Sequence, residues 1–276
     1  MGISSEVLGA AIIVLGAGVC FSIGWFTGKR GRKIASTPPT PPWSAGEHLA
    51  MILHHIRTPL TGMMWAVKEV WESAPEGSEE KAKLLRIYDE NIRILSAVEE
   101  LLSSSRASAG RVNYDFEVTD TNKIEQLILR GLSEMSSSAH EKNISLHIET
   151  KPLDTKLLKT DLEKIMTVAQ TLFENAVMYT NPGGNITVLL KEDGSYFIFE
   201  IADSGIGIPE KDRLRIFTEF FRAENAQKKV PSSYGVGLFL AKTFVDAHGG
   251  TITFAPNHEN GGNGTVFTVK LPLLQK

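Results

Sequence analysis

Cysteine is almost absent from this chain of 276 residues, since Cys20 is the only one. A single thiol excludes an internal disulfide framework and any metal site built from clustered cysteines. An excess of basic charge is also absent. Residues 1–33 carry four basic side chains and one acidic one, a net +3, so the remainder of a chain with net charge −3 carries −6. An acidic remainder argues against nucleic acid as a partner.

The composition that is present is that of a globular protein, with 42% hydrophobic and 22% charged residues. Such a chain can bury a core over most of its length. A length of 276 residues suffices for one or two small domains with additional segments.

The first apolar stretch, residues 7–26, contains no charge and is followed at once by a basic cluster at 29–33. A bilayer core needs about 20 residues of helix. The basic cluster predicts that the remainder of the chain lies in the cytoplasm. We expect residues 1–35 to be a single-pass anchor in the cell (inner) membrane. A cleaved signal peptide is the alternative, although basic residues occupy the place of its cleavage site.

A proline-rich linker at 36–43 follows the expected anchor, with four prolines in seven residues. Proline favours extended polyproline geometry and interrupts a helix. We therefore hypothesise that the anchor only tethers the protein, and that any signal arrives through a partner or at the later domains.

Two amphipathic helices are predicted next, over residues 44–73 and 79–106, with Pro75 and Gly77 in the turn between them. Apolar residues step by four and three along the first helix, which is typical of a packed seam. The second helix carries a wider apolar stripe than one partner helix covers. We predict an all-α hairpin that forms a four-helix bundle with a second copy of the chain. The small polar run 103–110 is interpreted as a hinge.

Strand and helix patterns mix over the remainder of the chain. Strands are predicted at 112–118, 144–148, 186–190, 196–202, 251–254 and 265–271, and helices at 121–140, 161–179 and after Gly237. This mixture predicts an α+β two-layer sandwich with helices on one face of the sheet. The predicted multi-domain order is therefore an anchor, a linker, a hairpin domain at 44–108 and an α+β domain at 109–276.

The first helix contains the run His54-His-Ile-Arg-Thr-Pro-Leu60, in which Thr58 lies one turn after His54 on the same side. A core helix with two incidental histidines is the simplest interpretation. The run nevertheless resembles the H-box of bacterial two-component sensor histidine kinases, usually His-Glu-Leu-Arg-Thr-Pro-Leu. The resemblance implies that His54 accepts a phosphoryl group and that Thr58 is the phosphatase position. His55 departs from the family, which has an acidic general base there.

Two stretches near the middle of the α+β region resemble nucleotide-binding boxes of the same family. Leu172-Phe-Glu-Asn-Ala-Val-Met-Tyr-Thr180 resembles the N-box, which implies that Asn175 binds Mg²⁺ through its side-chain oxygen and that Tyr179 contacts the nucleotide. Asp203-Ser-Gly-Ile-Gly-Ile-Pro209 resembles the first glycine box. The resemblance implies that Asp203 accepts a hydrogen bond from the adenine amino group, while Gly205 and Gly207 let the backbone approach closely.

Two later stretches complete the resemblance. Ser233-Tyr-Gly-Val-Gly-Leu238 resembles the second glycine box, which implies that Gly235, Gly237 and Leu238 present backbone N–H groups to the phosphates. Phe217-Thr-Glu-Phe-Phe-Arg222 resembles the F-box, in which Arg222 reaches phosphate. Residues 208–234 would then form a long lid over ATP.

Each box alone is a common turn, and it is their order after an H-box, over residues 44–273, that carries the resemblance. The resemblance implies a dimeric membrane kinase with a GHKL ATP-binding domain that uses ATP and Mg²⁺. Such a kinase would phosphorylate His54 and pass the phosphoryl group to a response-regulator receiver domain. Departures at Thr171, Met178 and Ser233 predict slow turnover. A phosphatase-biased homologue and a non-catalytic nucleotide-binding membrane scaffold are the alternatives.

Overall fold

The computed structural model describes residues 45–231, 233–258 and 263–274, with side chains from Met51 onward except that of His54. The predicted anchor and proline-rich linker lie outside these residues. Among the helices that are described, none combines the length and apolar character needed to cross a bilayer.

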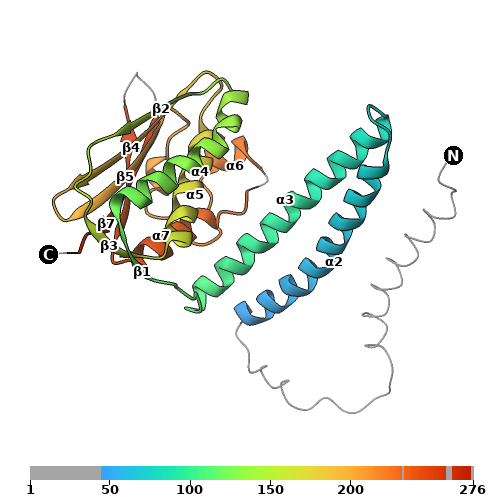
Figure 1. Ribbon diagram of the computed structural model, residues 1–276, viewed down its shortest axis with the longest axis horizontal. Helices are drawn as coiled ribbons and strands as arrows, with labels where there is room; N and C mark the ends of the chain where they lie inside the picture. Colours follow the sequence, from blue (N-terminus) through green and yellow to red (C-terminus); the bar gives the residue numbers. More distant parts are fainter. Residues whose placement is uncertain (1–44, 232, 259–262, 275–276) are drawn as a thin grey trace, which may run out of the picture. The chain divides into compact units, whose positions relative to one another are not determined.

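The two predicted amphipathic helices are present as an antiparallel hairpin (Figure 1). Helix α2 spans Ala45–Ser73 and helix α3 spans Glu79–Ser108. Ser78 begins α3 because its hydroxyl accepts a hydrogen bond from the Lys81 N–H at 3.1 Å, as an N-cap residue does. The hinge predicted at 103–110 is wrong for its first six residues, which continue α3 through Ser108.

The hairpin buries a small apolar core and leaves other apolar side chains exposed. Leu53 packs with Val98 and Leu102, each 6% exposed or less. Five residues of the predicted stripes remain exposed to solvent, namely Ile56, Met63, Val70, Ile87 and Ile94. Trp65, Leu85 and Ile92, which lie outside the stripes, are exposed as well. A single hairpin therefore does not cover its own apolar surface, as the wide stripe predicts.

The α+β domain contains a five-stranded sheet and a separate two-stranded one. The five strands lie in the order β2 (Ser145–Thr150), β4 (Asn185–Asp193), β5 (Tyr196–Asp203), β7 (Gly264–Pro272) and β6 (Thr251–Asn257). The β2–β4 pair is parallel and the other neighbours are antiparallel. The second sheet pairs β1 (Glu117–Asp120) with β3 (Leu157–Thr160).

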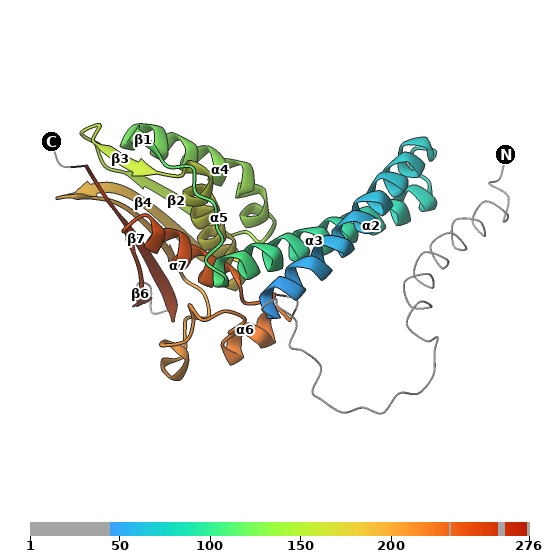
Figure 2. The same ribbon diagram turned by 90° about the horizontal axis from the view of Figure 1, so that it is seen from below.

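Three helices cover one face of the large sheet (Figure 2). They are α4 (Thr121–Glu141), α5 (Leu162–Tyr179) and α7 (Gly237–Ala247). Buried residues alternate along β4 and β7 and meet the apolar faces of these helices in one core. The predicted two-layer α+β sandwich is therefore confirmed.

Two details of the prediction are wrong. The strand expected at 112–118 begins only at Glu117, because Val112 and Tyr114 pack against the core without a strand partner. Strand β3 was not predicted, since it has only four residues.

The expected lid, 208–234, contains the short helices η2 (Glu210–Asp212) and α6 (Glu224–Lys229).

Candidate functional site

A cavity of about 840 Å³ lies between α3, α5, the lid and the start of α7. It brings together most of the residues predicted to bind nucleotide and metal, which are Asn175, Tyr179, Asp203, Gly207, Arg222, Gly235, Gly237 and Leu238. Gly205 does not line the cavity and is buried beneath it. The predicted boxes, although far apart in sequence, therefore form one site.

Asp203 ends strand β5 at the floor of this cavity and is 6% exposed. Its Oδ1 accepts hydrogen bonds from the backbone N–H groups of Gly205, at 2.8 Å, and Thr265, at 3.3 Å. Burial raises the pKa of Asp203 to about 6, although these two bonds and the charge of Lys229 act in the opposite direction. A buried carboxylate aimed into a cavity is suited to read a hydrogen-bond donor on a ligand.

The glycines after Asp203 are required by close backbone contacts. A Cβ on Gly205 would lie 2.6 Å from the carbonyl oxygen of Tyr179. Gly207 has φ +63°, and a Cβ there would lie 1.8 Å from the carbonyl oxygen of Asn263. The backbone of the first glycine box therefore packs closely against Tyr179 at the end of α5 and against Asn263 just before β7.

Asn175 is half-buried on the side of α5 that faces the cavity. Two carboxylates that were not predicted line the same cavity, Glu174 beside it and Glu100 from α3. Burial raises the pKa of both, and the charge of Glu174 raises that of Glu100 further. Carboxamide and carboxylate oxygens suit a hard cation such as Mg²⁺. The described residues contain no cluster of three His, Cys, Asp or Glu that would hold a metal unaided.

The start of α7 offers backbone donors to the cavity. Val236 occupies the N-cap position and makes no side-chain capping bond, so no side chain of its own satisfies the first-turn N–H groups. Gly235, at φ +73°, lies so close to the lid that a Cβ would be 2.7 Å from the carbonyl oxygen of Phe221. Uncapped N–H groups at a helix start form an anion site, as the second glycine box predicts.

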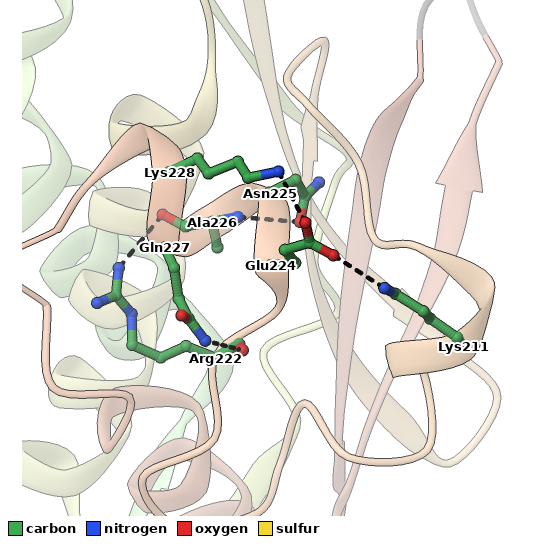
Figure 3. Close-up of polar contacts among 7 residues, drawn as sticks. All are labelled: Lys211, Arg222, Glu224, Asn225, Ala226, Gln227 and Lys228. Carbon is green, nitrogen blue, oxygen red and sulfur yellow. Dashed lines mark hydrogen bonds and ion pairs between the residues drawn. The ribbon is translucent and has the colours of Figure 1, made fainter.

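The lid is held together by its own polar contacts (Figure 3). The Arg222 guanidinium donates to the carbonyl oxygens of Ala226, Val230 and Pro231 at the end of α6. Glu224 pairs with Lys228 at 2.7 Å and with Lys211 at 3.0 Å. The Arg222 side chain therefore caps the C-terminal end of α6. The predicted contact of Arg222 with phosphate stays a prediction.

Two further lid residues connect α6 to the predicted boxes. The Lys229 ammonium donates to the Tyr179 carbonyl at 2.7 Å and to Asn181 Oδ1 at 2.6 Å. The Asn225 carboxamide donates to the Gly207 carbonyl at 3.0 Å. Neither residue was predicted to belong to the site, although the adjacent basic pair at 228–229 within the predicted lid is a signal for Lys229 in the sequence.

The predicted phosphoacceptor segment lies within α2. His54 is helical, but its side chain lies outside the description. His55 and Thr58 are both exposed, and Arg57 pairs with Glu99 of α3 at 2.7 Å. Of the described α2 residues, none lines the cavity.

Two family models match the chain. Residues 44–110 match the His Kinase A (phospho-acceptor) domain. Residues 160–275 match the histidine kinase-, DNA gyrase B-, and HSP90-like ATPase family. The first match covers the hairpin, and the second covers α5, the lid and α7, which line the cavity together with α3.

Curated relatives align over most of the chain. The sensor histidine kinase WalK of Bacillus subtilis is 30% identical over 229 residues, 82% of this chain and 36% of that protein. The circadian input-output histidine kinase CikA of Synechococcus elongatus is 26% identical over 230 residues, 82% of this chain and 30% of that protein. The chain thus spans about a third of the length of the curated relatives it matches.

Solved structures show the same arrangement of elements. Full-length ShkA in complex with AMPPNP aligns with a TM-score of 0.68 at 26% identity, over 84% of this chain and 47% of that chain. The Acinetobacter baumannii histidine kinase AdeS aligns with a TM-score of 0.54 at 20% identity, over 80% of this chain and 98% of that chain, and supports the fold. With both family models in the expected order, the chain belongs to the bacterial two-component sensor histidine kinases.

Proposed function

We propose that this protein binds ATP in the α5–lid–α7 cavity, autophosphorylates on His54 and transfers the phosphoryl group to an aspartate of a response-regulator receiver domain. The observation that carries the proposal is the convergence of Asp203, the two glycine boxes and Asn175 on one cavity, in a chain whose α2 contains the H-box. The AMPPNP bound by the related ShkA supports ATP as the nucleotide.

Each end of the cavity has a separate task in this proposal. The buried Asp203 carboxylate accepts the adenine amino N–H at one end. The uncapped N–H groups at the start of α7 bind phosphate oxygens at the other end. Asn175, with Glu174 beside it, would hold Mg²⁺, which would neutralise charge on the phosphates when bound.

In the chemical step a ring nitrogen of His54 attacks the γ-phosphorus. A nitrogen–phosphorus bond forms, the bond from phosphorus to the bridging oxygen of ADP breaks, and the second ring nitrogen can release its proton to a base. The exposed imidazole of His55 occupies the position of the family's acidic base. The aspartate of the receiver domain then attacks the same phosphorus, and the nitrogen–phosphorus bond breaks.

Phosphatase activity is the second candidate function, and the exposure of Thr58 favours it. Its hydroxyl lies one turn after His54 and on the solvent side of α2, where it can orient a water toward a phosphorylated receiver domain. A non-catalytic scaffold is the third candidate. Its test is the same as that of the first two.

We further propose that the protein acts as a homodimer anchored in the cell membrane, with residues 44–276 in the cytoplasm. The exposed isoleucines of α2 and α3 support the dimer. The uncharged run at 7–26 and the basic cluster at 29–33 support the anchor.

The test is incubation of the 276-residue chain with Mg²⁺ and radiolabelled ATP, with His54→Ala and His55→Glu as variants. Acid-labile label in the wild type that is lost in His54→Ala is the expected result. His55→Glu restores the family's base and is expected to raise the rate, with general bases typically contributing about 10²–10⁴-fold. Transfer is then measured by adding a purified receiver domain.

Other outcomes select the other candidates. Label that appears only in His55→Glu, together with loss of phosphate from a phosphorylated receiver domain in a Thr58-dependent manner, supports the phosphatase. Nucleotide binding without label and without receiver dephosphorylation supports the scaffold. Absence of ATP binding contradicts all three.

A further inference from the structure

Two serines near the end of α3 bind a single carboxylate of the lid. Ser104 and Ser108 lie four residues apart and therefore on the same face of the helix. The Ser104 hydroxyl donates to Oε1 of Glu219 at 2.6 Å, and the Ser108 hydroxyl donates to Oε2 at 2.6 Å. Hydrogen bonds of this length to an ionised oxygen are roughly twice as strong as neutral ones. Both oxygens of Glu219 are thus bound by α3.

The position of Glu219 makes these bonds relevant to the cavity. Phe217, two residues earlier, packs against the large core, and Phe221, two residues later, lines the cavity. Between them Phe220 has φ +61°, a left-handed conformation that few non-glycine residues adopt. Ser104 has no exposed surface, so the contact is enclosed on the α3 side. Glu219 therefore attaches the middle of the lid to α3.

The same helix brings an acidic side chain to the predicted phosphate end of the cavity. Residues of α3 between Glu90 and Ser103 line the cavity wall. Oε1 of Glu100 lies 3.6 Å from where a Cβ on Gly237, the first residue of α7, would stand. Uncapped N–H groups at that position attract an anion, and an ionised Glu100 would carry the same sign of charge as the phosphates. The Glu100 carboxylate and a phosphate group would therefore compete for the N–H groups at the start of α7.

We propose that Glu219, Ser104 and Ser108 form a latch that holds α3 across the nucleotide cavity in a resting state, with Glu100 at the phosphate end. Opening the latch withdraws Glu100 and lets the lid and α3 separate. No described residue of α2 lines the cavity, so transfer to His54 calls for such a rearrangement. This last step rests on the proposed kinase function, whereas the effect on nucleotide affinity does not.

The test introduces a like charge at the exposed end of the latch. Ser108→Asp places a carboxylate against Glu219, and Ser108 is exposed, so the new charge needs no burial in the core. We expect amide hydrogen exchange across 214–222 to accelerate about tenfold and AMPPNP to bind severalfold more tightly. Ser108→Thr keeps the hydroxyl and is expected to behave as wild type. Ser137→Asp adds the same charge on the exposed face of α4 as a matched control.

A reversed pair provides the rescue. Ser108→Asp combined with Glu219→Lys restores attraction across the latch, and both readouts are expected to return toward wild-type values. Unchanged exchange and unchanged AMPPNP affinity in Ser108→Asp, with a wild-type melting temperature, would overturn the latch. Faster exchange without tighter binding would overturn its inhibitory role. Absence of labelled His54 in every variant would count against the proposed kinase function. Hydrogen exchange across 214–222 and AMPPNP affinity would still decide whether the latch exists.

Discussion

Single residues in this protein carry chemistry that depends on burial, and Asp203 is the best example. Its carboxyl group is almost enclosed, and two backbone N–H groups bind one of its oxygens. Burial nevertheless dominates and raises its pKa from 3.8 to about 6. The free protein therefore holds a proton at Asp203 over a pH range in which an unfolded chain has lost it.

This shift predicts a stability that depends on pH. Because the folded pKa is raised, the contribution of Asp203 to the free energy of unfolding is full below about pH 4 and is lost as the pH rises through about 6. Two pKa units correspond to roughly 3 kcal/mol. We expect Asp203→Asn to remove this fall, measured by urea unfolding at several values of pH. Asp193→Asn, at an exposed strand end, is the matched control, and an unaltered pH slope in Asp203→Asn contradicts the prediction.

The chemistry of Asp203 and of the glycines could be predicted because it depends on the order of short motifs. Glu219 could not be predicted, because its partner Ser104 lies 115 positions away in the sequence. Glu100 likewise gains its place from the packing of α3 against α7. Contacts of this kind depend on tertiary structure, and a local pattern does not encode them.

At the scale of elements, helix α6 depends on Arg222. A helix of six residues is too short to be stable alone. The Arg222 guanidinium reaches three carbonyl oxygens at its end, which a lysine ammonium on a different stem cannot reproduce. Arg222 therefore orders the end of α6, and the ion pairs of Glu224 and the contacts of Lys229 and Asn225 attach the helix to its neighbours.

We expect Arg222→Lys to loosen α6. Amide hydrogen exchange across 224–230 should accelerate about tenfold in the nucleotide-free chain, because the carbonyls at the helix end lose their donor. Arg130→Lys on the exposed face of α4 is the control, since Arg130 forms an exposed ion pair with Glu134 one turn away. Equal exchange in wild type and Arg222→Lys would show that α6 is held by other contacts.

Most longer elements could be predicted because their ends carry local signals. Ser78, Asp120 and Asp161 each accept a hydrogen bond from the N–H three residues later and so begin α3, α4 and α5. Strand β3 carries no such signal and exists because β1 pairs with it. The serine run at the end of α3 was interpreted as a hinge from composition, whereas burial of Ser104 and Ser105 keeps it helical.

At the scale of the whole molecule, the hairpin presents an apolar surface that a partner helix pair would cover. Ile87 is 49% exposed and Ile94 is 42% exposed, both on α3. Ile56 of α2 is 41% exposed. These side chains support the four-helix bundle proposed above, in which each copy covers the other.

We expect Ile87→Glu to weaken dimerisation by about 100-fold or more, because each dimer would bury two unpaired charges. Light scattering coupled to size exclusion, over a dilution series, measures the change in mass. Val118→Glu introduces the same change at a 60% exposed residue of β1 and should leave the mass unaltered. A dimer that survives Ile87→Glu at high dilution would place the interface elsewhere.

Helix α3 runs without interruption for 30 residues, from the turn of the hairpin to the serines that bind Glu219. At 1.5 Å per residue this is a stiff rod of about 45 Å. Successive residues are about 100° apart around such a rod, so a twist of that size at the turn would carry Ser104 and Ser108 off Glu219 together. Rotation of α3 at the turn of the hairpin would therefore be transmitted along the helix to the lid.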